Sequence, residues 1–96
     1  MEVKHETLSL AQTKGYNPKK DSNVQNNVTQ SNLQTWLREK KNIHINLYPY
    51  PHSTTNDWYY IVTDIKSKLI CCESSIVFES FDKGLEAALN QSLIFI

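Results

Sequence analysis

Glycine is scarce in this sequence. Only Gly15 and Gly84 occur among its 96 residues, and they lie far apart. Loops that hold nucleotide phosphates need several closely spaced glycines, so the usual nucleotide-binding loops are excluded. No other cofactor motif is present, and we expect the protein to work without a cofactor.

Cysteine is equally rare, since Cys71 and Cys72 are the only two and they are adjacent. Neighbouring residues cannot cross-link distant parts of a fold, which excludes a disulfide framework. With His44 and His52 they are the candidate zinc ligands, but structural zinc sites use pairs of ligands separated by a few residues. Adjacent residues of a strand also point to opposite faces. We therefore expect small buried thiols and no metal site.

A cysteine nucleophile activated by histidine is the remaining catalytic alternative. It needs a thiolate close to a base and to an oxyanion donor. The sequence has no glycine-rich turn and no clustering of such groups, and His44 alternates outward from an apolar strand. We therefore expect a protein that is not an enzyme.

No charge of one sign dominates, because ten basic residues balance ten acidic ones. Proteins that bind duplexes rely on many Lys and Arg contacts to phosphate, so nucleic acid is not the expected partner. No run approaches the ~18–20 apolar residues that cross a bilayer. The first four residues lack the apolar core of a secretory signal. We expect a cytoplasmic protein without a membrane contact.

The N-terminal part of the chain is weakly patterned. Residues 7–14 are compatible with two helical turns, which Gly15 closes in the left-handed conformation. Residues 19–30 are rich in Lys, Asn, Gln and Ser, with too few apolar side chains to offset the entropy of ordering. The sequence therefore predicts a short helix with a flexible polar segment over 1–28, followed by one domain over 29–96.

A helix is predicted over 32–41 at the start of this domain. Ser31 and Gln34 match the capping box that begins many helices. Apolar residues then follow at helical spacing and form one stripe, with Leu33, Trp36 and Leu37.

Three strands are predicted after this helix. Apolar and polar residues alternate from Ile43 to Leu47, as in a strand with one buried face. The segment 58–65 is dense in aromatic and β-branched residues and predicts the second strand. Its buried face is either Trp58, Tyr60 and Val62 or Tyr59, Ile61 and Ile65. The third strand covers 69–78, with an interruption around Glu73 to Ser75.

Ser80 caps a final helix, with Asp82 favourably placed in its first turn. The apolar stripe of this helix is Phe81, Leu85, Ala88, Leu89, Ser92, Leu93 and Ile96. The predicted fold class is thus α+β: helix, three-stranded antiparallel sheet, helix (α-β-β-β-α), after a short N-terminal helix and polar loop. Both flanking helices should cover one face of the sheet. The tail 93–96 is apolar all round, so the N-terminal segment, a second copy or another protein must cover it.

Exposed aromatic and apolar side chains are the candidate interaction surface of this domain. The candidates are Tyr48, Tyr50, Trp58, Tyr60, Phe95 and Ile96. Such a surface suits another protein or self-association. The alternative is weak binding of single-stranded nucleic acid, whose bases stack on aromatic rings, but flanking Lys and Arg are sparse.

Two segments carry a resemblance to a known family. Residues 29–45 contain TQS-x-LQ-x-WLRE followed by NIHI, and residues 80–89 read SFDKGLEAAL. Together with the short helix 9–16, they resemble a family of small uncharacterised proteins common in phage and prophage regions of gut bacteria. The resemblance implies a mobile-element origin and no chemistry. The chain departs from the family at Lys83 and Gly84, where an acid and alanine are usual, which should weaken the start of the last helix slightly.

These observations predict a non-enzymatic accessory protein of phage or prophage origin. Its excess of apolar and aromatic surface on a neutral domain without catalytic motifs favours action through protein–protein interaction.

Overall fold

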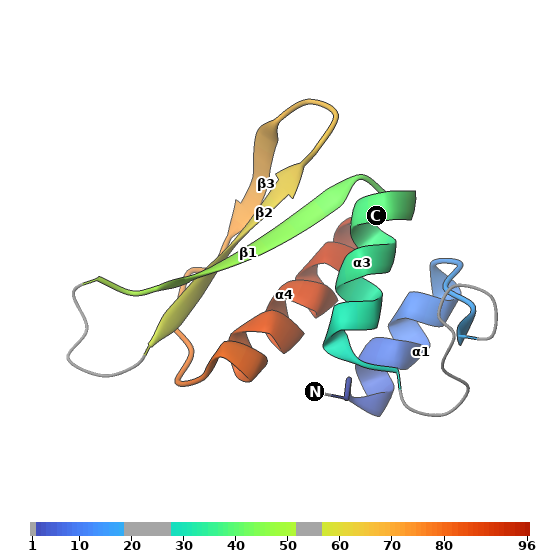
Figure 1. Ribbon diagram of the computed structural model, residues 1–96, viewed down its shortest axis with the longest axis horizontal. Coiled ribbons are helices and arrows are strands. Elements are labelled where there is room, and N and C mark those ends of the chain that lie inside the picture. The colour runs from blue at the N-terminus through green and yellow to red at the C-terminus, as the bar shows by residue number, and fades with distance from the viewer. Residues whose placement is uncertain (1, 19–27, 52–56) are drawn as a thin grey trace.

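The computed structural model describes residues 2–18, 28–51 and 57–96 (Figure 1). Within these ranges an antiparallel sheet packs against helices, which confirms the predicted α+β class. The helices are α1 (His5–Thr13), α3 (Gln30–Lys40) and α4 (Phe81–Phe95), and the strands are β1 (Ile43–Pro49), β2 (Trp58–Asp64) and β3 (Leu69–Glu73).

The sheet has the strand order β1-β2-β3, with both neighbouring pairs antiparallel. In the β1–β2 register Ile45 lies opposite Val62, and both side chains are almost fully buried. Tyr60 is buried as well, which settles the open question of β2: the face with Trp58, Tyr60 and Val62 turns inward. Packing decided this, because both faces of β2 are apolar enough to be buried.

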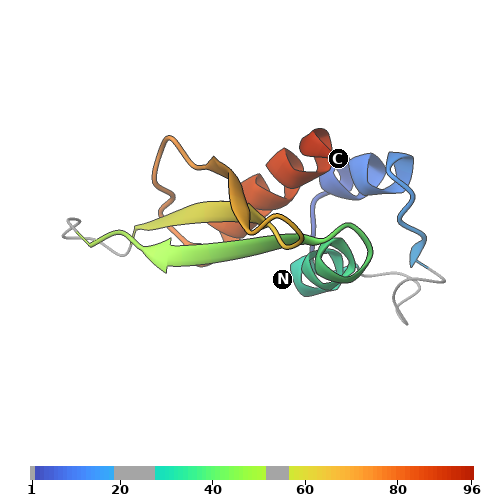
Figure 2. The same cartoon turned by 90° about the horizontal axis from the view of Figure 1, so that it is seen from above.

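The helices α3 and α4 cover one face of the sheet, as predicted. Leu33 and Leu37 of α3 and Leu85 and Leu89 of α4 share one core cluster with the inward side chains of β1 and β2. Figure 2 shows α4 along the sheet, with α1 next to its C-terminal end. The opposite face of the sheet is left without a covering helix in the described part of the chain.

The start of α3 differs from the prediction. The N-cap is Thr29, whose Oγ1 accepts a hydrogen bond from the Asn32 backbone N–H at 3.2 Å, while the Thr29 N–H donates to Asn32 Oδ1 at 2.9 Å. The predicted Ser31–Gln34 capping box was therefore wrong. The earlier start places Gln30 inside the helix, where its side chain reaches α4. Gln34 instead donates to the backbone oxygen of Ile45 at 3.1 Å.

The N-terminal segment joins the same core. Gly15 follows α1 with a φ of 103°, as predicted for the residue that closes a helix. Tyr16 is buried and packs edge-on against Trp36, with ring centroids 5.3 Å apart. Most of the predicted flexible segment, residues 19–27, lies outside the described residues. Where it is described, the segment 1–28 packs with residues of 29–96 in one cluster.

The apolar tail is covered in part by α1. This helix packs against α4, and Lys14 Nζ donates to the backbone oxygen of Ile96 at 3.1 Å. Leu93 is fully buried, while Ile94 and Phe95 stay 64% and 57% exposed. The N-terminal segment, one of the three expected partners of this tail, therefore covers one side of it.

The third strand is interrupted where the sequence predicted. β3 ends at Glu73, the Ser74 N–H donates to the Tyr60 oxygen at 3.0 Å, and pairing resumes only at the bridge between Trp58 and Phe78. The chain between Ser74 and Phe78 bulges outward, because it spans more residues than the facing segment of β2. Ile76 is left 63% exposed by this bulge.

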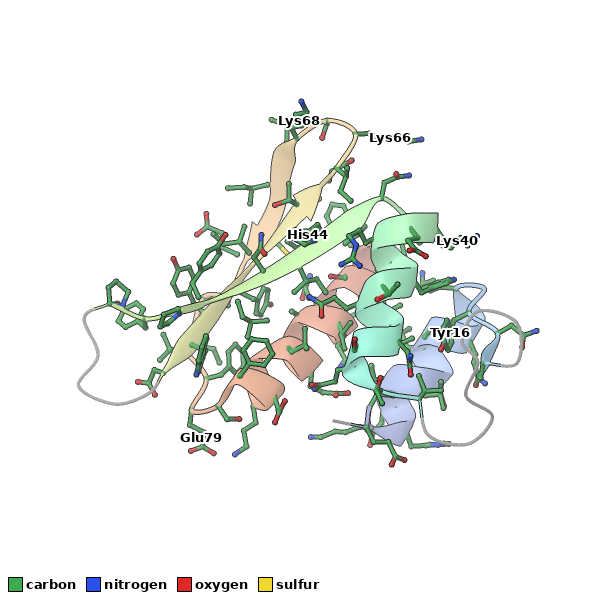
Figure 3. All side chains as sticks on the ribbon, in the orientation of Figure 1. Tyr16, Lys40, His44, Lys66, Lys68 and Glu79 are labelled. Atoms are coloured by element: carbon green, nitrogen blue, oxygen red, sulfur yellow. The ribbon has the colours of Figure 1, made fainter. Side chains whose placement is uncertain are left out.

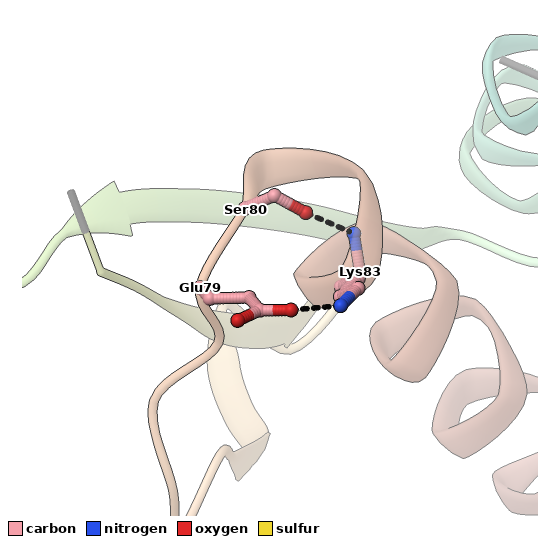
Figure 4. Close-up of polar contacts among 3 residues, drawn as sticks. All are labelled: Glu79, Ser80 and Lys83. Carbon is pink, nitrogen blue, oxygen red and sulfur yellow. Dashed lines mark hydrogen bonds and ion pairs between the residues drawn. The ribbon is translucent and has the colours of Figure 1, made fainter.

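Ser80 caps α4 as predicted, accepting from the Lys83 N–H at 3.2 Å. Lys83 stands where an acid was expected, and its ammonium group pairs with Glu79 just before the helix (Figure 4). Within the stripe, Ser92 satisfies its hydroxyl by donating to the Ala88 oxygen at 2.8 Å. Phe81, the first residue of α4, is 43% exposed.

Gly84 has a packing role that the sequence did not reveal. A Cβ at this position would lie 2.7 Å from Leu47 Cδ2, so the absence of a side chain lets α4 approach β1 closely. The expected weakening of the helix by glycine is thus accompanied by a closer contact between helix and sheet.

Glu86 is the one acidic residue of α4 that is buried, with 7% of its surface exposed. Its carboxylate accepts from the Lys4 N–H at 3.1 Å, from the Thr7 hydroxyl, and from Gln30 Nε2 at 3.0 Å. Lys4 and Thr7 belong to the start of α1, and Gln30 belongs to α3. The single carboxylate therefore links α1 and α3 to α4.

Removing this carboxylate should destabilise the fold. We expect Glu86→Ala to lower the free energy of unfolding by about 3 kcal/mol, because two buried donors and the part-buried Lys4 N–H lose their charged acceptor. The matched variant Glu79→Ala removes an exposed ion pair and should cost less than about 1 kcal/mol. Urea titrations of both variants measure the difference. Equal losses would show that Glu86 does not hold the helices together.

The position of the α3 cap is testable in the same way. Thr29→Ala should lower the free energy of unfolding by about 1 kcal/mol, since Thr29 supplies the capping oxygen. Ser31→Ala should leave it nearly unchanged, because Ser31 lies inside the helix and is exposed. The reverse order in urea titrations would favour the cap predicted from the sequence.

Candidate functional site

The structure distributes the six predicted surface residues over three places. Tyr48 and Tyr50 belong to the uncovered face of the sheet, Trp58 and Tyr60 to the face that meets α4, and Phe95 and Ile96 to the C-terminal end of α4. Alternation along a strand explains the separation, because successive side chains of β2 point to opposite faces. The six residues do not form one surface.

Trp58 and Tyr60 have packing roles on the inner side. The Trp58 ring meets Phe81 edge-on at 5.3 Å, and the Tyr60 ring stacks on Phe78 at 6.0 Å. Tyr60 is only 8% exposed, so it offers almost no surface to a partner. These two rings connect the sheet to the start of α4.

Three tyrosines cluster on the uncovered face. Tyr48 lies directly opposite Tyr59 in the β1–β2 register, and their rings stack with centroids 5.4 Å apart. Tyr50 meets Tyr59 edge-on at 6.3 Å. Tyr59 replaces Trp58 and Tyr60 as the third aromatic residue of this face. The sequence pointed to it only as one of two alternatives for β2.

A groove lies beside this tyrosine cluster. It has a volume of about 670 Å³ and is formed by the end of β1, Tyr59 of β2 and the bulge after β3. Its lining residues are Tyr50, Pro51, Tyr59, Glu73, Ser74, Ser75, Ile76 and Val77. This volume lies in the range of ordinary ligand sites. Among the described residues that line it, Glu73 is the only charged one, so the groove combines mostly apolar and uncharged polar residues with an acidic rim at Glu73.

The bulge supplies two of the most exposed aliphatic side chains near the groove. Ile76 is 63% and Val77 40% exposed, beside Tyr50 at 41%. Because the chain leaves the sheet after Ser74, these side chains are held outward instead of being packed on β2. The interruption of the third strand was predicted, but the groove that it creates was not.

A second hollow, of about 800 Å³, lies where α1 meets the start of α4. Four acidic residues, Glu2, Glu6, Asp82 and Glu86, and two lysines, Lys4 and Lys83, are among its lining residues. Glu86 already accepts the three hydrogen bonds described above. Within the described ranges, no three His, Cys, Asp or Glu side chains gather closely enough to hold a metal ion.

The cysteines are free and partly buried against the core. Burial, followed by the neighbouring Cys71, raises the pKa of the Cys72 thiol. A raised pKa disfavours the thiolate that a nucleophilic cysteine needs. His44 lies on β1 (Figure 3), where its Nε2 is 3.0 Å from Asn46 Oδ1. His52, the other candidate partner, lies outside the described residues.

Burial also raises the pKa of Tyr60, with the nearby Cys72 as a smaller cause. Both groups are neutral when protonated. Deprotonation places a negative charge in a buried or partly buried position, which destabilises the folded state. Their contribution to stability is complete below the ordinary pKa values of 9.0 for cysteine and 10.0 for tyrosine, and is lost as the pH rises through the raised values.

Stability should therefore decline in alkaline solution. We expect the free energy of unfolding, measured by urea titration, to fall as the pH rises above 9.0, and to fall less in Cys72→Ala. Cys71→Ala should keep most of the decline, because burial is the larger cause of the Cys72 shift. A Cys72→Ala variant with the full wild-type slope would contradict this assignment.

In the part of the chain that the structure describes, no helix is long and apolar enough to cross a membrane. The chain matches no family model, no curated protein and no solved structure. Its surfaces, rather than a related protein, are therefore the basis for a functional assignment.

Proposed function

We propose that the chain is a small, non-enzymatic accessory protein that binds an apolar segment of another protein in the groove beside Tyr50 and Tyr59. Its phage or prophage origin is supported by the sequence resemblance alone. A cytoplasmic location is part of the same proposal and rests on the sequence alone.

One observation carries this proposal: a group of exposed apolar side chains lies at and beside the groove. Tyr48, Tyr50, Ile76 and Val77 are each at least 39% exposed, and they lie on or beside the uncovered face of the sheet. Scattered apolar residues are normal on a protein surface, whereas a contiguous group around a hollow is typical of a binding site.

The lining indicates the chemistry of the partner. Tyr50 and Tyr59 contribute aromatic rings to the lining, Pro51 a saturated ring, and Ile76 and Val77 aliphatic side chains. Grooves of this kind accept extended apolar peptides. Glu73 adds a negative charge at the rim, so the best fit is an apolar segment that carries a Lys or Arg.

Binding of single-stranded nucleic acid is less well supported. The three tyrosine rings pack on one another, which leaves less ring surface for stacking with bases. Trp58, which was expected to join them, packs against Phe81 instead. The acidic rim would also repel phosphate groups.

The test is a comparison of two matched variants in a pull-down. Ile76→Lys places a charge at the groove, and Ile94→Lys places the same charge on α4 at nearly the same exposure, 63% against 64%. The tagged wild type and both variants are incubated with bacterial lysate, with and without nuclease, and bound proteins are identified by mass spectrometry. A partner of the groove should be lost by about tenfold or more with Ile76→Lys and retained with Ile94→Lys.

Two results would overturn the proposal. Equal capture by all three proteins would show that the groove is not the binding site. Capture that disappears with nuclease, and that weakens steeply with salt, would assign the aromatic face to nucleic acid.

A further inference from the structure

The two edge strands of the sheet, β1 and β3, differ in how they are protected from pairing with another strand. At the outer edge of β1, α3 packs against the strand and the Gln34 side chain occupies the backbone oxygen of Ile45. Pro49, at the end of β1, has no N–H to offer. Covering by a helix and the presence of proline are common ways to keep an edge strand from pairing. The β1 edge is therefore closed to another strand.

Among the described residues, the β3 edge has neither a covering helix nor a proline, and the one irregularity of its pairing with β2 is a register shift between Ile70 and Cys72. In the described part of the chain no strand follows β3, and the hairpin of β2 and β3 projects beyond the helices (Figure 1). Leu69 and Ile70 are 67% and 56% exposed, the largest exposures of apolar residues in the sheet. The four residues 69–72 carry no charge, although charged side chains are the usual protection of an isolated edge.

The charges at the two ends of β3 are opposite. Lys68 precedes the strand at the tip of the hairpin (Figure 3), and Glu73 ends it, both exposed. Two copies of a strand that pair antiparallel place the start of one beside the end of the other. Lys68 of each copy then lies next to Glu73 of the other, and the apolar residues 69–72 lie against themselves. The strand is thus complementary to its own antiparallel copy.

We propose that β3 pairs antiparallel with β3 of a second copy, so that two chains form one continuous six-stranded sheet. The pairing satisfies the outer backbone groups of β3 and buries Leu69 and Ile70 of both copies, one on each face of the sheet. It goes beyond the proposed function, because it uses the edge of β3 and leaves the groove for a different protein.

The first experiment is the mass of the full chain in solution by sedimentation equilibrium. We expect twice the 11.1 kDa of one chain at high concentration and dissociation on dilution. Ile70→Lys should weaken the dimer by at least about a hundredfold, because it loses two buried isoleucines and places two charged side chains in the contact. Leu69→Lys tests the other face, and Ile94→Lys is the control that should leave the dimer intact. Circular dichroism confirms that each variant is folded.

Charge exchange tests the antiparallel direction. Lys68→Glu and Glu73→Lys should each weaken the dimer by roughly tenfold at low salt, because each creates two like-charge contacts. The double variant Lys68→Glu, Glu73→Lys should recover most of the wild-type affinity. A merely structural effect of either substitution would not be rescued by the other.

The proposal is overturned by a chain that stays monomeric up to about 1 mM. It is also overturned by a dimer that resists Ile70→Lys and Leu69→Lys, or by a double charge exchange that fails to restore association. These results are independent of the groove. A dimer without a captured partner removes the proposed function alone, and a captured partner on a monomer removes the β3 pairing alone.

Discussion

Three helices meet at the carboxylate of Glu86, and their arrangement determines which surfaces the protein exposes. The carboxylate is buried on α4 and is held by donors from the start of α1 and from Gln30 of α3. Because a buried carboxylate is stable only with such donors, α1 and α3 must both be in place when α4 packs. With the helices fixed on one side, the sheet can bury only its inner face. The surface available to partners is what remains: the tyrosine face, the bulge after β3 and the β3 edge.

The two faces of β2 show how this division works. Both faces are apolar, so burial of Tyr60 and Val62 necessarily leaves Tyr59 on the outer side. Tyr59 is then stacked on Tyr48, and the outward bulge of the chain after Ser74 adds Ile76 and Val77 beside it. A groove forms where a regular third strand would have given a flat sheet. The surface proposed for partner binding thus follows from which face of β2 is buried in the core.

The packing of the helices also affects the edges of the sheet and the polar groups that could have taken part in chemistry. Gln34, freed from the cap by the earlier start of α3, closes the β1 edge, while β3 keeps an uncharged centre between Lys68 and Glu73. The acidic hollow near Glu86 belongs to the contact between the helices. Cys72 is partly buried near Tyr60, and this burial raises the pKa of its thiol. Within the described residues, the surfaces proposed for binding are therefore a groove and exposed apolar patches.

The sequence by itself determined the class and order of the elements. Alternation over residues 43–47, helical spacing in α3 and α4, the Ser80 cap and Gly15 are local signals, and each was confirmed because neighbouring residues alone decide it. The α3 cap was misassigned because two overlapping cap sequences occur within six residues, and only the reach of Gln30 to Glu86 separates them. The buried face of β2, the close approach at Gly84 and the division of the six surface residues were decided by tertiary structure. Each depends on which side α4 packs against, and residues far apart in the chain set that contact.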